Sequence, residues 1–205
     1  MKIIVERLFL QIKEMKLLFL IPFLGYYILL PVCTYGYVMN PIGKADPFTI
    51  FADLGYNFIP VFSTWWIFLC LREVCESDGR EVLLLGGGTT EVNLCLFVLN
   101  MLSMLPIFFV FKDTDGSVMS FYLQMLVITF FLSGGVYLLC FEMKNMTLPF
   151  LITLIYCVFS TSSNEFLDFM KYSVLNNIDW MQNAMGFIVV GSLFWLLANR
   201  RSKHL

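Results

Sequence analysis

Long stretches of apolar residues, separated by short polar segments, make up most of this chain. A helix that crosses the hydrocarbon core of a membrane needs about 20 such residues, because its backbone polar groups find no water there. Six stretches meet this length, the fifth only just. They predict spans at about residues 17–38, 48–71, 92–111, 118–141, 147–163 and 181–199. The expected fold is all-α: a polytopic membrane protein with a single transmembrane domain over residues 1–205.

Two further segments show apolar residues at helical spacing among charged ones. In residues 1–16, Ile4, Leu8 and Ile12 fall on one face, which predicts an amphipathic helix lying on the membrane surface. In residues 164–179 charges return, but Phe and Met keep the helical repeat. We expect an interfacial or re-entrant helix there, on the outer side between the fifth and sixth spans.

The positions of Lys and Arg predict the orientation of the spans, because cytoplasmic loops are enriched in these residues. With the amino terminus inside, the inner segments hold Lys2, Arg7, Lys13, Lys16, Arg72, Arg80, Lys144, Arg200, Arg201 and Lys203. The outer segments hold only Lys44, Lys112 and Lys171. Both termini are therefore predicted to be cytoplasmic, and the expected location is the plasma membrane.

The composition of the chain gives little support to several kinds of binding and catalytic site. Hydrophobic residues make up 59% of the chain and charged residues 14%, and the formal net charge of -2 gives no reason to expect nucleic acid as a partner. The single histidine, His204, leaves no imidazole for a metal site, a haem or a catalytic base within any span. Ser133-Gly134-Gly135 is accordingly interpreted as a close-packing site between helices. We expect no catalytic residues, no metal and no cofactor in this chain.

The most polar segment lies between the second and third predicted spans. Over residues 72–85 acidic and basic side chains come first, and the apolar Val82 to Leu85 follow. Glu73, Glu76 and Arg80 fall three and four residues apart, on one helical face. The pattern predicts a short cytoplasmic helix lying under the membrane, charged below and apolar above.

This segment resembles the coupling helix of the permease subunits of type 2 ATP-binding-cassette exporters. Their motif has acidic residues, a Gly, a Glu and a leucine-rich tail; Glu73, Glu76, Gly79, Glu81, Leu83 and Leu84 stand in that order here. The topology of the whole chain is also similar to theirs. The sequence departs from the family after the leucines, where Gly86-Gly87-Gly88 replaces the usual Pro and Ser. The resemblance implies that Glu73, Glu76, Gly79, Arg80 and Glu81 couple the chain to an ATPase.

The same resemblance implies the partners. Two separate ATPase subunits bind ATP and Mg²⁺, and a second permease, identical or homologous, completes a translocation path within the membrane lipids. The substrate expected for such a path is a hydrophobic peptide or a lipid, since the many Met and Phe side chains suit a greasy cavity.

Polar residues within the spans are candidates for lining that path, because a polar side chain in the membrane is costly unless it faces a partner helix or a cavity. These candidates are Asp53, Asn57, Ser63, Thr64, Asn100 and Gln124. An equal alternative is that Asp53 reaches outer water and that Asn100 bonds a neighbouring helix.

Three interpretations of the function remain open. Besides an exporter permease, the chain fits a non-transporting membrane interaction or immunity protein, in which residues 72–85 are an ordinary solvated loop. An ion-coupled transporter is the third, weakened because Asp53 is the only acidic residue in the confidently predicted spans.

Overall fold

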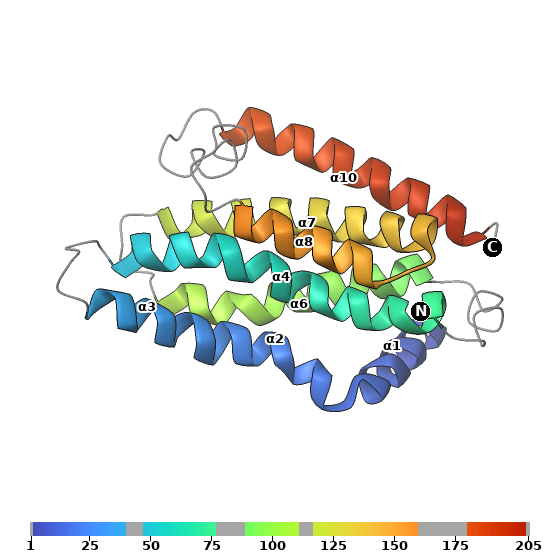
Figure 1. Ribbon diagram of the computed structural model, residues 1–205, viewed down its shortest axis with the longest axis horizontal. Coiled ribbons are helices and arrows are strands. Elements are labelled where there is room, and N and C mark those ends of the chain that lie inside the picture. The colour runs from blue at the N-terminus through green and yellow to red at the C-terminus, as the bar shows by residue number, and fades with distance from the viewer. Residues whose placement is uncertain (1, 40–46, 77–88, 111–116, 160–179, 204–205) are drawn as a thin grey trace.

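Helices make up nearly all of the described chain, and most of them run along one common direction (Figure 1). The computed structural model describes residues 2–39, 47–76, 89–110, 117–159 and 180–203. These ranges contain no strand, which confirms the predicted all-α class for them. The predicted interfacial helix at 164–179 lies outside the described residues.

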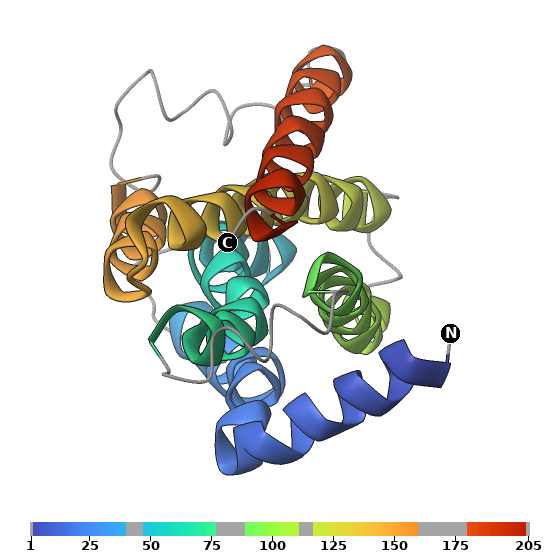
Figure 2. The same cartoon turned by 90° about the vertical axis from the view of Figure 1, so that its right-hand side faces the viewer.

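The first helix, α1 (Lys2–Met15), is set apart from the rest by a sharp turn at Lys16. Lys16 has a φ of 48°, the left-handed conformation that interrupts a regular helix. Figure 2 shows α1 lying across one end of the bundle. The amphipathic helix predicted over residues 1–16 is thus confirmed as a helix over Lys2–Met15, and its place on a membrane surface stays a prediction.

The first predicted span is an irregular helix. It consists of η1 (Lys16–Leu20), α2 (Ile21–Leu24), the π-helical turn η2 (Gly25–Leu29) and α3 (Leu30–Val38). In η2 the Leu30 N–H bonds the Gly25 carbonyl, five residues earlier. Pro31 follows directly and supplies no N–H of its own, which is one of the ordinary causes of such a widened turn.

Gly25 also permits a close approach of the next helix. A Cβ atom at this position would lie 2.4 Å from the ring of Phe62. No larger residue fits there without displacing that ring. The widened turn is therefore held against α4 at the level where the polar side chains described below meet.

The remaining helices form the body of the bundle. They are α4 (Pro47–Glu76), α6 (Thr89–Val110), α7 (Ser117–Met143), α8 (Thr147–Phe159) and α10 (Trp180–Lys203). α7 and α8 are joined by a tight turn, in which Lys144 takes a positive φ and Asn145 Oδ1 accepts the Thr147 N–H at 2.7 Å. A left-handed residue followed by an Asn cap ends one helix and starts the next.

Four helical stretches are long and apolar enough to cross a membrane. They are Leu8–Val38, Pro47–Arg72, Thr89–Val110 and Val118–Met143. They contain the first four predicted spans, apart from residue 111, which is not described, and they make the chain a helical membrane protein. α8 and α10 are not among the four, so the fifth and sixth spans remain predictions.

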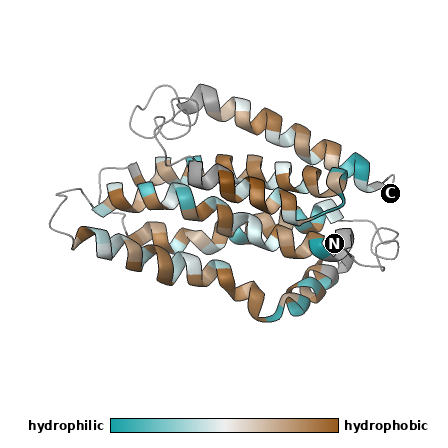
Figure 3. Ribbon diagram, viewed as in Figure 1, coloured by the Kyte–Doolittle hydropathy of each residue, from teal (hydrophilic) through white to brown (hydrophobic). Residues whose placement is uncertain are grey.

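Apolar side chains face both the interior and the outside of the bundle. Aromatic rings pack together near the starts of α4 and α7, where Phe121 lies at the meeting point of Phe48, Phe51, Tyr56 and Phe108. Large apolar side chains are also exposed along α10 and along the first span. Figure 3 shows hydrophilic residues gathered on α1 and at the end of α10. Exposed apolar faces with polar ends are what contact with lipid requires.

The most extensive helix pair is α7 with α10, and glycines bring the two together. A Cβ on Gly134 would lie 2.8 Å from the Trp195 ring and 3.0 Å from the Gly191 carbonyl oxygen. A Cβ on Gly191 would lie 3.1 Å from the Phe131 Cα. The interpretation of Ser133-Gly134-Gly135 as a packing site is confirmed for Gly134.

Gly191→Leu should destabilise the bundle, because the new side chain meets the α7 backbone directly. An overpacked core site costs about 1–3 kcal/mol. Gly186→Leu is the matched control, since it lies on the same helix and a Cβ added there would have no atom within 4 Å. Unfolding in mixed detergent micelles measures both. Equal stability of the two variants would contradict a glycine-dependent α7–α10 contact.

Candidate functional site: polar networks inside the bundle

A polar network in the bundle interior joins the first three predicted spans. The Tyr26 hydroxyl lies 3.0 Å from Ser63 Oγ and donates to Asn100 Oδ1 at 3.0 Å. All three side chains are buried. Because the surrounding side chains are apolar, each of these bonds holds its helices in one fixed arrangement.

The widened turn η2 positions the tyrosine of this network. Tyr26 and Tyr27 are neighbours within η2, and both reach other helices. Tyr26 points into the core, whereas the Tyr27 hydroxyl donates to the Ser103 carbonyl on α6. Widened turns of this kind occur often at functional sites. The widened turn η2 is therefore the part of the first span that positions Tyr26 in the network.

The structure brings together some of the sequence-predicted candidates and not others. Ser63 and Asn100 meet through Tyr26. Gln124 lies in a separate pair, where its Oε1 accepts the Tyr56 hydroxyl. Thr64 donates to the Pro60 carbonyl of its own helix at 3.0 Å.

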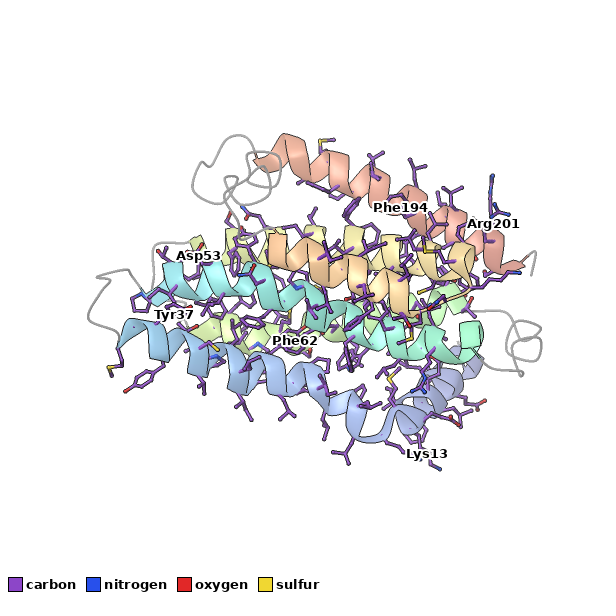
Figure 4. All side chains as sticks on the ribbon, in the orientation of Figure 1. Lys13, Tyr37, Asp53, Phe62, Phe194 and Arg201 are labelled. Carbon is purple, nitrogen blue, oxygen red and sulfur yellow. The ribbon has the colours of Figure 1, made fainter. Side chains whose placement is uncertain are left out.

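Asp53 and Asn57 lie one turn apart on α4, as their spacing predicts. The Asn57 amide donates to the Asp53 backbone carbonyl at 3.1 Å, and the Asp53 side chain is exposed. Figure 4 shows Asp53 near the same end of the bundle as Tyr37, opposite to Lys13 and Arg201. Of the six pathway candidates, Ser63, Thr64, Asn100 and Gln124 are buried within this chain itself.

A second network closes the opposite end of the bundle, and the sequence did not single it out. The Tyr137 hydroxyl lies 3.1 Å from Thr89 Oγ1 and 2.9 Å from Thr90 Oγ1. Thr90 donates in turn to Asn199 Oδ1 at 3.0 Å. Nearby, the Arg201 Nε pairs with Glu142 at 2.7 Å. The start of α6 is therefore tied to the ends of both α7 and α10.

The end of α4 is tied to the first segment of the chain instead. The indole N–H groups of Trp65 and Trp66 donate to the carbonyls of Leu18 and Phe19 at 3.2 and 3.0 Å. These carbonyls belong to η1, where the helix is irregular. The Trp66 ring also stacks on the Phe19 ring at 4.6 Å.

One turn further along α4, the Cys70 thiol donates to Gln11 Oε1 on α1 at 3.1 Å. Two indole donors and one thiol therefore fix the turn between α1 and the first span against α4.

The predicted coupling residues lie only partly within the described chain. Glu73 and Glu76 belong to the last turns of α4, which continues without interruption from the second predicted span to Glu76. The first residues of the predicted 72–85 helix are thus part of α4. Gly79, Arg80 and Glu81 lie outside the described residues.

In the part of the chain that the structure describes, no three His, Cys, Asp or Glu residues come together. Three tyrosines that the sequence analysis did not single out, Tyr26, Tyr56 and Tyr137, have hydroxyls that bond other helices. Their signal was available, because a buried Tyr hydroxyl almost always needs a partner. The identity of the partner was not, since each bond joins helices distant in sequence.

Tyr26→Phe should destabilise the chain by about 1–2 kcal/mol, because it removes the one hydroxyl that donates to Asn100 on α6 and also bonds Ser63 on α4. Tyr35→Phe is the control, since Tyr35 is an exposed tyrosine of the same span. Detergent unfolding of the two variants gives the comparison. If Tyr26→Phe unfolds like Tyr35→Phe, the hydroxyl bonds do not hold the helices together.

Compared with known proteins, the chain matches no family model, no curated protein and no solved structure. A function for it has to be argued from its own residues and contacts.

Proposed function

We propose that this chain is the permease subunit of an ATP-driven exporter, coupled to separate ATPase subunits through residues 72–85. The observation that carries the proposal is the course of α4. This helix runs unbroken from the bundle interior to Glu76, inside the segment that resembles a coupling helix. A force applied at Glu73 or Glu76 is therefore transmitted along one rigid element to Ser63.

The contacts of α4 explain how such a force reaches other helices. Near its cytoplasmic end, Trp65, Trp66 and Cys70 bind the turn between α1 and the first span. Further along, Ser63 meets Tyr26, which bonds Asn100 of α6. Movement of α4 thus changes the position of the first span and strains the network that links it to α6.

In this proposal no residue of the chain performs covalent chemistry. ATP and Mg²⁺ bind to the two partner ATPases, whose closure displaces the coupling segments. A second permease, identical or homologous, supplies the other half of the path, and a hydrophobic peptide or a lipid is the substrate. Four of the six polar pathway candidates are buried within one subunit. They act by setting helix positions, and the apolar faces and Asp53 are left to contact substrate or lipid.

Glu76→Lys should release the ATPase, because it reverses a charge on the face that docks into the partner. Affinity purification of the tagged chain from its own cells in mild detergent measures the bound ATPase, which we expect to fall at least about tenfold. Glu14→Lys is the control, as an exposed acidic residue of α1 outside the coupling segment.

Two outcomes of this purification contradict the proposal. Equal loss of ATPase in the Glu14 control would mean that charge in general, and not the coupling segment, holds the partner. An unmodified chain that carries no ATPase at all would favour a membrane interaction protein.

The proposed topology places both termini in the cytoplasm. A fluorescent protein that folds only in the cytoplasm should fluoresce when fused after Leu205, and a phosphatase active only outside should work when inserted at Asp115. A fusion after Leu205 that does not fluoresce, or a phosphatase at Asp115 that is inactive, would contradict six spans with this orientation.

A further inference from the structure

Two fully buried polar side chains of the bundle have no hydrogen-bond partner. Asn93 of α6 has neither its amide nitrogen nor its amide oxygen bonded within the described chain. Ser133 of α7 likewise has an unbonded hydroxyl. Both residues are 0% exposed. Ser133 sits directly beside the Gly134 packing site, but its hydroxyl takes no part in that contact.

The pairing of α6 with α7 places these two residues opposite each other. Tyr137 of α7 bonds Thr89 of α6, and Phe130 packs on Phe97 with ring centroids 5.6 Å apart. Thr129 then donates to the Met101 sulfur at 3.5 Å. As the numbers rise along α6 they fall along α7, so the two helices are antiparallel and in a fixed register.

Within that register Asn93 and Ser133 lie at the same level and on facing sides. Asn93 is four residues after Thr89 and four before Phe97, and both of these contact α7. Ser133 is four residues after Thr129 and four before Tyr137, and both of these contact α6. Residues four apart share a helix face. The amide and the hydroxyl therefore face one another without forming a direct bond.

An unsatisfied amide is costly in such a place. A buried donor or acceptor left without a partner costs about 1–3 kcal/mol, and Asn93 presents both. A single water between the helices can bond both polar atoms of the Asn93 amide and the Ser133 hydroxyl. It accepts from the amide nitrogen and donates to the amide oxygen and to the Ser133 oxygen. Buried waters typically make about three such bonds.

We propose that Asn93 and Ser133 form a water-binding site between α6 and α7. The polar lining continues two turns further along α6 to the Asn100 amide nitrogen, which also lacks a partner among the described residues. The α6–α7 contact is then wet near the start of α6, whereas at the glycine contact the backbones of α7 and α10 approach directly. The site does not depend on the proposed transport function.

Water-edited solid-state NMR of the ¹⁵N-labelled protein in bilayers tests the site directly. Magnetisation from water should reach the Asn93 side-chain amide several-fold faster than the Trp66 indole N–H, a buried donor already bonded to the Phe19 carbonyl. Loss of the signal in Asn93→Leu assigns it. Transfer to Asn93 as slow as to Trp66 would show a dry site and overturn the proposal.

The direction in which substitutions at Asn93 and Ser133 change the unfolded-to-folded ratio gives a second test. With a bridging water, Asn93→Leu and Ser133→Ala should each raise the unfolded-to-folded ratio about fivefold. The double variant should raise it less than the product of the two, because both remove the same bridge. Ser192→Ala on α10 is the control, expected to change the ratio by less than about twofold. If Asn93→Leu instead lowers the ratio, the amide was dry and unpaired, and the site does not exist.

Discussion

A polar group inside this bundle has to find its partner on another helix, on its own backbone or in a buried water, because the surroundings of the spans are apolar. That constraint makes the backbone helical, since only a helix satisfies its own N–H and C=O groups without help from neighbours. It also makes each buried side-chain hydroxyl or amide a link between helices. Tyr26, Ser63 and Asn100 form such a link, and Tyr137 with Thr90 and Asn199 forms another.

Different parts of the chain anchor the end of α4 and the start of α6. The end of α4 is bonded to the first segment by Trp65 and Trp66, whereas the start of α6 is bonded to α7 and α10 through Thr90. Residues 77–88 therefore follow one anchored helix end and precede another, and the Tyr26 network and the Tyr56–Gln124 bond connect the same helices further along.

The contact of α7 with α10 and the contact of α7 with α6 differ in what lies between the helices. At Gly134 and Gly191 the backbones of α7 and α10 approach so closely that no side chain fits between them. At Asn93 and Ser133, by contrast, polar atoms face each other without bonding directly. The first contact is a direct approach of two backbones, and the second is a polar contact that a bridging water completes. Ser133 and Gly134, which belong to these two contacts, are consecutive residues of α7 and lie on different sides of that helix.

The sequence by itself determined the helical class, the positions of the first four apolar spans and the amphipathic first helix. These follow from local composition, since about 20 apolar residues and a helical repeat need no knowledge of neighbours. It also identified Ser63 and Asn100 as polar residues in apolar surroundings. Only the tertiary structure decided that Tyr26 joins them, that Thr64 bonds its own backbone and that Gln124 pairs with Tyr56. Such partners lie up to 74 residues apart, and the register between two helices is a property of their packing rather than of either segment.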